Sequence, residues 1–225
     1  MRDTQRAASN RRRTRLLNWV ALLLMIAGGA ALGWCVAILV DTQNAQRAAR
    51  EQLESMASAT TSSSATSTPR SRVSVQPGTG TPLAELSIPR IGLSAVVLQG
   101  SDEHTLRVGA GHIETTPLPG ESGNVAIAGH RDSFFRPLRN VQVGDDIWLN
   151  TPTAPVHYRV SSFRVVNPSE VSVIDPTTDA VLTLVTCYPF YFVGSAPDRF
   201  IVRASLVRDG ELSPDQQPAP LAQAR

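Results

Sequence analysis

The chemistry in this chain centres on a cysteine and an arginine that a hairpin would bring together. Val181–Cys187 is an apolar run typical of a buried strand, and Arg199–Ala204 alternates between apolar and polar residues. An eleven-residue loop, residues 188–198, joins the two segments. In an antiparallel hairpin, Cys187 and Arg199 would face each other at the open end, with Cβ atoms about 5 Å apart. The pattern predicts a thiol beside a permanent cation.

His130 is the second candidate for chemistry. It follows the short apolar strand predicted over Val125–Ala128, after Gly129, so its ring can project from a strand end into a cleft. A nearby imidazole is the usual activator of a thiol. Activation is needed because a thiol pKa of about 8.5 leaves only about 3% thiolate at pH 7. Two alternatives stay open: a buried core cysteine and a structural histidine.

Three further features are weaker candidates. Asp132 can orient His130 as a third catalytic residue, or it can pair with Arg131 on the surface. His112 lies in the predicted Gly-rich turn 109–112, from which it can line the cleft. His112, His130 and Cys187 lack the close spacing of a structural zinc site, so we expect no metal and no cofactor. His104 and His157 are expected on the surface or in a strand.

The elements that would position these residues are short strands separated by Gly, Pro, Asn and Asp. The candidate strands are Leu86–Ile88, Ala95–Leu98, Val125–Ala128, Asp146–Leu149, Val156–Val166, Val181–Cys187 and Arg199–Val207. Short helical turns are expected at Asp102–Val108 and Phe134–Asn140. Strands at this spacing indicate a barrel or a sandwich. The fold class is therefore mainly β.

An apolar segment near the N-terminus predicts a membrane anchor. Trp19–Val40 contains 22 residues without a charge, and a helix of that length spans about 33 Å, enough for a hydrocarbon core. The Arg cluster at residues 11–15 would keep the N-terminus cytoplasmic. A cleaved signal peptide is disfavoured because the apolar run is too long. A lipoprotein signal is disfavoured because Trp34 precedes Cys35.

These features divide the chain into five predicted parts. Residues 1–15 form a cytoplasmic basic tail, and residues 16–40 form a transmembrane helix. Residues 41–82 begin as a juxtamembrane helix to residue 56 and continue as a linker rich in Ser, Thr and Pro. Residues 83–208 form the folded domain, large enough for a core without disulfides. Residues 209–225 form a disordered tail.

The composition excludes several classes of protein. Charged residues make up 18% of the 225 residues, against roughly 25% in an average chain. The net charge of +2 combines +5 from residues 1–15, which hold six Arg and one Asp, with −3 from the remainder, which holds 15 Arg and 18 acidic residues. A basic nucleic-acid-binding protein, a coiled coil and a highly charged disordered chain do not fit. Two cysteines cannot form a disulfide framework.

The candidate residues also carry a family resemblance. Ala128-Gly129-His130, the segment Thr183-Leu184-Val185-Thr186-Cys187, and Arg199 twelve residues after the cysteine together resemble the signature of the sortases. The stretch from Cys187 to Phe200 resembles the class D-like members. The predicted anchor, linker and strands fit the same family, so the resemblance covers most of the chain.

The resemblance implies an eight-stranded β-barrel with short helices and a cysteine transpeptidase activity. Cys187 would be the nucleophile, His130 the general acid and base, and Arg199 the donor to substrate and oxyanion. Thr186, Ala128 and His112 would contact the substrate, and the loop over residues 167–180 would wall its groove. The implied substrate is a surface protein or pilin with a Leu-Pro-x-Thr-Gly/Ala-like sorting signal. The implied acceptor is a cell-wall or protein amine.

Three functions remain in competition at this stage. The first is a membrane-anchored transpeptidase whose catalytic domain lies outside the cytoplasmic membrane, in the cell envelope. The second is a cysteine hydrolase or protease on the same site, in which water resolves the thioester. The third is a non-catalytic barrel that binds envelope material. No nucleic-acid partner is expected.

Overall fold

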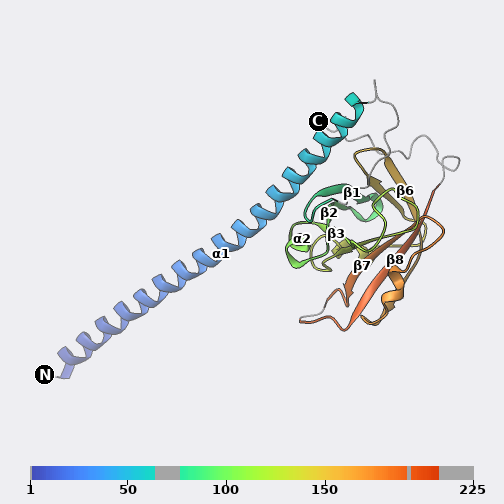
Figure 1. Cartoon of the computed structure of the whole chain (residues 1–225). Helices are drawn as coiled ribbons and strands as arrows, with labels where there is room; N and C mark the ends of the chain where they lie inside the picture. The colour runs from blue at the N-terminus through green and yellow to red at the C-terminus, as the bar shows by residue number, and fades with distance from the viewer. Residues whose placement is uncertain (1, 64–76, 192–193, 208–225) are drawn as a thin grey trace. The chain divides into compact units, whose positions relative to one another are not determined.

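The structure, a computed structural model, describes residues 2–63, 77–191 and 194–207. The chain forms two compact units, Met1–Asn44 and Ala45–Arg225. A long helix, α1 (Arg2–Ser63), begins in the first unit and ends in the second, which holds all the strands of the described residues (Figure 1). Residues 64–76 of the predicted linker and the predicted tail 209–225 lie outside the described residues.

Eight strands of the described chain close into a barrel in the order β1-β2-β3-β4-β7-β8-β6-β5 (Figure 1). They are β1 (Pro82–Ile88), β2 (Leu93–Gln99), β3 (Ala110–His112), β4 (Asn124–Gly129), β5 (Asp146–Asn150), β6 (Pro155–Val166), β7 (Val181–Tyr188) and β8 (Asp198–Leu206). The seven predicted strands are confirmed, each with ends that differ by a few residues. Of the two alternatives left by the strand pattern, the fold is the barrel.

Strand β3 falls where the sequence predicts a Gly-rich turn, so that prediction was wrong. It pairs in parallel with β2 and antiparallel with β4. Glycine usually weakens a strand, unless another part of the backbone approaches closely. A Cβ on Gly111 would lie 2.4 Å from the carbonyl oxygen of Gly100. The glycine is therefore what allows this strand to fit.

Four short helices connect the strands in the described part of the chain. They are η1 (Pro89–Ile91), α2 (Glu103–Val108), η2 (Arg136–Asn140) and η3 (Val171–Ile174). The predicted helical turns correspond to α2 and η2. Helix α2 begins after Asp102, whose carboxylate accepts hydrogen bonds from the backbone N–H groups of His104 and Thr105, the usual N-cap arrangement.

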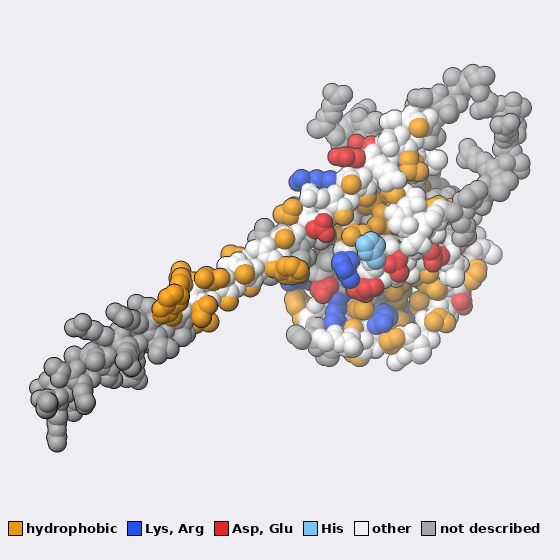
Figure 2. All heavy atoms as spheres, turned by 60° about the vertical axis from the view of Figure 1, so that its left-hand side comes forward, with side chains coloured by type: hydrophobic (Ala, Val, Ile, Leu, Met, Phe, Trp, Pro, Cys, Tyr) orange, Lys and Arg blue, Asp and Glu red, His pale blue; other side chains and the backbone are white. Residues whose placement is uncertain are grey.

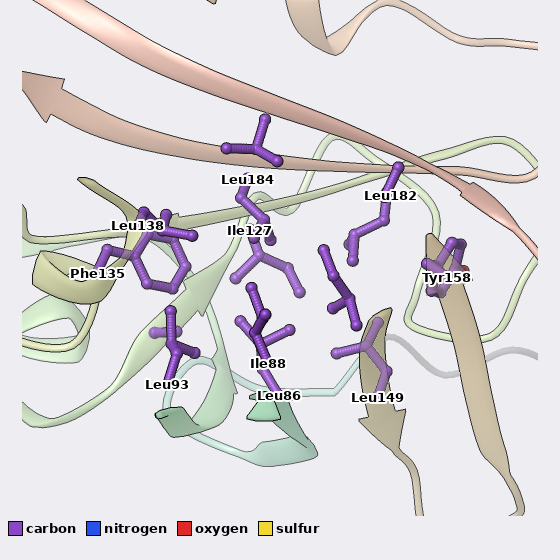
Figure 3. Packing of buried hydrophobic residues seen from close by; sticks show 14 of the residues in the cluster. Leu86, Ile88, Leu93, Ile127, Phe135, Leu138, Leu149, Tyr158, Leu182 and Leu184 are labelled. Atoms are coloured by element: carbon purple, nitrogen blue, oxygen red, sulfur yellow. The ribbon is translucent and has the colours of Figure 1, made fainter. Parts of the chain in front are cut away.

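The barrel interior holds one main hydrophobic cluster. Seven of the eight described strands contribute large side chains to it, and β3 contributes only Ala110. Figure 3 shows Phe135 and Leu138 at one end of this cluster and Tyr158 at the other, with Leu182 and Leu184 of β7 between them. Phe135 and Leu138 come from the segment around η2. Because they are fully buried, this segment closes one end of the barrel.

The part of α1 that belongs to the second unit packs on the outside of β2. Leu53 is fully buried against Val96 and Leu98. The Gln46 amide accepts a hydrogen bond from the Val96 N–H at 3.0 Å and donates to the carbonyl of Val108. Gln46 thereby satisfies a backbone N–H of β2 and a backbone carbonyl at the end of α2.

Helix α1 continues to Ser63, beyond the end predicted at residue 56. The Ser55 and Ser58 hydroxyls donate to backbone carbonyls three and four residues earlier, at 2.8 and 2.9 Å. Such bonds satisfy the serine hydroxyls inside the helix, although they do not favour the helix over other structures. The beginning of the predicted linker is thus helical.

The apolar stretch of α1 is visible in Figure 2 as a band of hydrophobic side chains. Its large described side chains are exposed, with Leu24 at 68% and Met25 at 78% of full exposure. Across the residues that the structure describes, no helix meets the length and apolarity required to cross a membrane.

Candidate active site

The predicted nucleophile lies on the outer face of the barrel wall. Along β7, Leu182 and Leu184 point into the main core, whereas Val185 packs in a separate cluster outside it. Side chains alternate between the two faces of a strand, so Cys187 shares the outer face with Val185. Cys187 is partly exposed and is a free thiol.

The predicted pairing of Cys187 with Arg199 is confirmed. Strands β7 and β8 are antiparallel neighbours, and their register places Cys187 opposite Arg199. Residues that face each other in an antiparallel pair project to the same side. The thiol and the guanidinium group therefore emerge together on the outer face, at the open end of the hairpin.

His130 reaches the same place from β4. Strand β4 is parallel to β7, and its last residue, Gly129, pairs with Thr186. The next residue along each strand is His130 and Cys187 respectively, so the two lie side by side at the strand ends. Because Val125 and Ile127 point into the core, alternation places His130 on the outer face with Cys187.

The turn after His130 fixes its backbone. The carbonyl of His130 accepts a hydrogen bond from the Phe135 N–H at 3.1 Å, which folds residues 131–135 back onto the barrel end. A Cβ on Gly129 would lie 2.7 Å from the Phe135 ring. Glycine is needed before the histidine because the ring that closes the barrel packs directly against it.

Arg131 ties this turn to the loop between Cys187 and Arg199. Its guanidinium group donates to the carbonyl of Pro189 at 2.9 Å and to the carbonyl of Gly194 at 2.8 Å. Sequence reasoning considered Arg131 only as a partner for Asp132 and missed this role. The contact joins residues far apart in the chain, so no local pattern signals it.

Arg199 is half-buried and is held by its own loop. Its Nη1 donates to the carbonyl of Asp198 at 3.0 Å and to that of Ala196 at 3.5 Å. None of the ion pairs formed between described residues includes Arg199. Its charge is thus left for a ligand or for the Cys187 side chain beside it.

Aromatic rings support the hairpin from the inner face. Tyr188 and Phe190 meet edge to face at 6.0 Å between centroids, and Phe190 meets Phe200 in the same way at 5.4 Å. Phe200 is buried, next to Arg199 in sequence. The backbone that carries the thiol and the guanidinium therefore rests on a packed layer.

Of the two strand residues predicted to bind substrate, Thr186 faces the barrel interior, because it alternates with the outward-facing Cys187, and Ala128 faces outward. Thr186 is only 2% exposed, and its hydroxyl donates to the carbonyl of Gly129 at 2.7 Å. This bond joins the ends of β7 and β4, which gives the hydroxyl a structural partner. Ala128 is partly exposed and points outward, two residues before His130.

His112 is placed away from this group. It is 1% exposed on β3, where its Nδ1 lies 2.9 Å from the Gln99 side-chain oxygen and its Nε2 lies 2.8 Å from the Pro117 carbonyl. Burial lowers its pKa, which favours the neutral ring. The predicted contact of His112 with a substrate cleft is not seen, because the ring is enclosed by β2 and the turn after β3.

The remaining candidates are also accounted for. Asp132 is exposed on the turn after His130, and His104 is exposed on α2. His157 is buried on β6, where it stacks on Trp148 and contacts Asp146 at 2.9 Å. Within the described residues, no group of His, Cys, Asp and Glu side chains has an arrangement able to hold a metal ion.

Strand alignment therefore brings a thiol, an imidazole and a guanidinium together on one face of the barrel. The sequence of the barrel matches a known family. The sortase domain family matches residues 86–207. Sortase D of Bacillus subtilis is 31% identical over 192 residues, which cover 81% of this chain and 95% of the relative. The chain belongs to the sortase family, whose members are cysteine transpeptidases.

Solved structures agree with this assignment. A sortase D5 transpeptidase from Clostridium perfringens superimposes with a TM-score of 0.59 at 28% identity, covering 73% of this chain and 99% of that protein. Sortase E from Streptomyces avermitilis gives a TM-score of 0.52 at 32% identity, covering 59% of this chain and 91% of that one. The eight-stranded barrel is thus the sortase fold.

Proposed function

We propose that this protein is a membrane-anchored sortase that cleaves a Leu-Pro-x-Thr-Gly/Ala-like sorting signal through a thioester on Cys187. The acyl group is then transferred to an amine of the cell wall or of another protein. The observation that carries the proposal is the register of three strands, which aligns Cys187, His130 and Arg199 on one outer face.

The first half of the reaction needs Cys187 as a thiolate and His130 as an imidazolium. The Cys187 Sγ attacks the carbonyl carbon of the scissile peptide bond, and the carbonyl oxygen becomes an oxyanion. Arg199, which pairs with no carboxylate among the described residues, donates to that oxygen; such a donor contributes about 3–4 kcal/mol. His130 protonates the leaving amine, and collapse of the intermediate forms the thioester.

The second half of the reaction reverses these roles. The incoming amine loses a proton to neutral His130 as its nitrogen attacks the thioester carbon. Arg199 again stabilises the oxyanion, and Cys187 leaves as a thiolate, which restores the starting pair. Water in place of the amine gives hydrolysis, the competing activity on the same site.

The loop between β6 and β7, residues 167–180, supplies one wall of the proposed peptide groove. Its helix η3 contributes Val173 to a cluster with Val185 and Ile201. These two strand residues form the outward-facing pair next to Cys187 and Arg199. Replacing this loop with that of a sortase of different preference should change the preferred peptide.

Trp19–Val40 is the proposed anchor. Its support is the absence of charge over 22 residues, the preceding Arg cluster and the exposure of its described apolar side chains. The N-terminus would lie in the cytoplasm and the barrel outside it. Protease added to intact spheroplasts should digest the chain beyond residue 41, and complete protection would contradict this topology.

The central test is mass spectrometry of the purified protein with a sorting-signal peptide. A mass increase on Cys187 equal to the acyl fragment is expected, and Cys187→Ala should abolish both this adduct and turnover. The adduct should convert to an amide product when an amine such as triglycine is added.

The products distinguish the three functions. Amide product in proportion to added amine supports the transpeptidase. Release of free acid alone, whatever the amine concentration, would make the protein a hydrolase. No adduct with any sorting-signal peptide would favour a non-catalytic envelope-binding barrel, and turnover by Cys187→Ala would overturn the assignment of the nucleophile.

A further inference from the structure

The polar contacts that fix the β6–β7 loop differ in strength between its β6 side and its β7 side. On the β6 side, Glu170 pairs with Arg164 at 2.7 Å, but both side chains are exposed, and exposed ion pairs hold weakly. On the β7 side, the loop is bound by a fully buried side chain, Asn124, the first residue of β4.

Asn124 uses its whole amide group. Its Nδ2 donates to the carbonyls of Val173 at 3.1 Å and Asp175 at 2.9 Å. Its Oδ1 accepts a hydrogen bond from the Thr183 hydroxyl at 2.6 Å. The orientation of the amide is unambiguous, because two carbonyls can only accept and need its two N–H groups.

Thr183 completes the connection between the loop and the strand of the thiol. It is fully buried on the outward-facing side of β7, four residues before Cys187. Its hydroxyl fixes the Asn124 amide, which in turn fixes the carbonyls on either side of Ile174. Because buried polar groups are costly to leave unpaired, these bonds set where η3 lies on the barrel.

We propose that the Asn124–Thr183 pair is a positioning device for substrate specificity. It holds the loop at a fixed distance from Cys187, so that the peptide meets a preformed wall, which reduces the ordering cost of binding. The inference rests on the proposed function, since it assumes that the peptide lies between this loop and Cys187. Neither residue touches the reacting atoms.

The test compares two identical substitutions at buried threonine hydroxyls. Thr183→Val removes the bond to Asn124. Thr151→Val removes a hydroxyl that donates to the Ala154 carbonyl at 2.7 Å in the turn between β5 and β6. That turn is far from the candidate site. It lies eleven residues along β6, or about 36 Å of strand, from Val166, the residue that pairs with Arg199. Thr183→Ser retains the hydroxyl.

Peptide kinetics and thiol reactivity should separate positioning from general damage. In Thr183→Val, the KM for the peptide should rise about tenfold with kcat within about twofold, the pattern of lost binding. Alkylation of Cys187 by iodoacetamide should proceed at the wild-type rate. Thr183→Ser and Thr151→Val should keep the wild-type KM. An unchanged KM in Thr183→Val, or an equal rise in Thr151→Val, would overturn the proposal.

Amide hydrogen exchange gives a readout that does not depend on turnover. Residues 170–176 should exchange faster in Thr183→Val than in Thr183→Ser or Thr151→Val, and Asn124→Asp should behave like Thr183→Val. Equal exchange in all variants would overturn the pair's role even if peptides are cleaved. Absence of turnover in the wild-type protein, with faster exchange in Thr183→Val, would contradict the proposed function and leave the positioning role supported.

Discussion

The tripeptide Ala-Gly-His occurs twice in this chain, at residues 110–112 and 128–130. The histidine of the first copy is buried, whereas the histidine of the second lies at a strand end beside Cys187. They lie on neighbouring antiparallel strands, with Gly111 opposite Ala128. In both copies the glycine admits a close neighbour, the Gly100 carbonyl in the first and the Phe135 ring in the second. The local sequence is the same, so its surroundings decide what each histidine does.

The difference lies in where each histidine falls on its ladder. His112 is paired within the sheet, between Gln99 of β2 and Ile127 of β4, and its ring is enclosed and hydrogen-bonded. His130 follows the last ladder pair of β4, so its ring stands at a strand end beside Cys187. A histidine becomes available for chemistry here by lying one residue past the ladder.

The largest expected effect separates the two histidines. His130→Ala should lower kcat/KM for the sorting-signal peptide by about 10²–10⁴-fold, the usual contribution of a general acid and base. His112→Gln should lower it less than tenfold, because that ring touches neither the thiol nor the outer face. Steady-state kinetics of both purified variants, with folding checked by circular dichroism, makes the comparison. A similar loss in both would remove the distinction.

The next effect concerns the cation beside the thiol. Arg199→Lys keeps the charge but replaces a planar fork of donors by a single ammonium group. We expect kcat to fall by about 10–10²-fold, part of what complete loss of an oxyanion donor costs. Single-turnover measurement of thioester formation isolates this step. A near-wild-type rate would reduce Arg199 to a general electrostatic role.

The residue after each histidine extends the comparison. Arg131 follows the second copy and binds two carbonyls of the β7–β8 loop, whereas Ile113 follows the first. Arg131→Met should lower kcat several-fold by loosening the loop between Cys187 and Arg199, with little change in the KM for the peptide. Arg131→Lys should recover only part of the loss, since one ammonium group replaces the fork. A wild-type kcat in Arg131→Met would show that the β7–β8 loop keeps its conformation without the hydrogen bonds from Arg131.

The sequence predicted the parts of this site that depend on strand periodicity. The apolar run before Cys187 and the alternation after Arg199 were enough to predict their pairing, because a hairpin offers few registers. The position of His130 at a strand end could be predicted from Val125–Ala128 for the same reason. These residues lie on regular strands, for which local pattern and final structure agree.

The parts that escaped prediction depend on contacts distant in sequence. Glycine at 111 indicates a turn unless the nearness of Gly100 is known, so β3 and the burial of His112 were missed. Asn124 has the sequence context of a turn residue, and its bonds to residues 173, 175 and 183 have no local signal. The packing of Leu53 on β2 likewise has no local signal in the sequence, and helix α1 continues past residue 56 into a segment whose serine-rich composition predicts a linker.

The smallest expected effect tests the enclosure of His112 through pH. Burial is the main cause that lowers its pKa; the Pro117 carbonyl and the carboxylates of Glu114 and Glu121 act in the opposite direction without reversing it. In the unfolded chain the histidine takes up a proton near pH 6.5. Below that pH the unfolded state binds more protons than the folded state, so His112 makes the free energy of unfolding fall with falling pH.

This contribution should vanish in His112→Gln, which cannot titrate. At pH 8 the variant should be less stable than the wild type by about 1–3 kcal/mol, because the substitution disturbs buried hydrogen bonds. Between pH 7 and pH 5, however, the variant should lose less stability than the wild type. Urea unfolding at intervals across this range measures both quantities. The other histidines contribute equally to both proteins, so the difference in slope belongs to residue 112. Parallel slopes would mean that His112 is protonated as readily in the folded barrel as in the unfolded chain, and the contrast between the two copies would then rest on position alone.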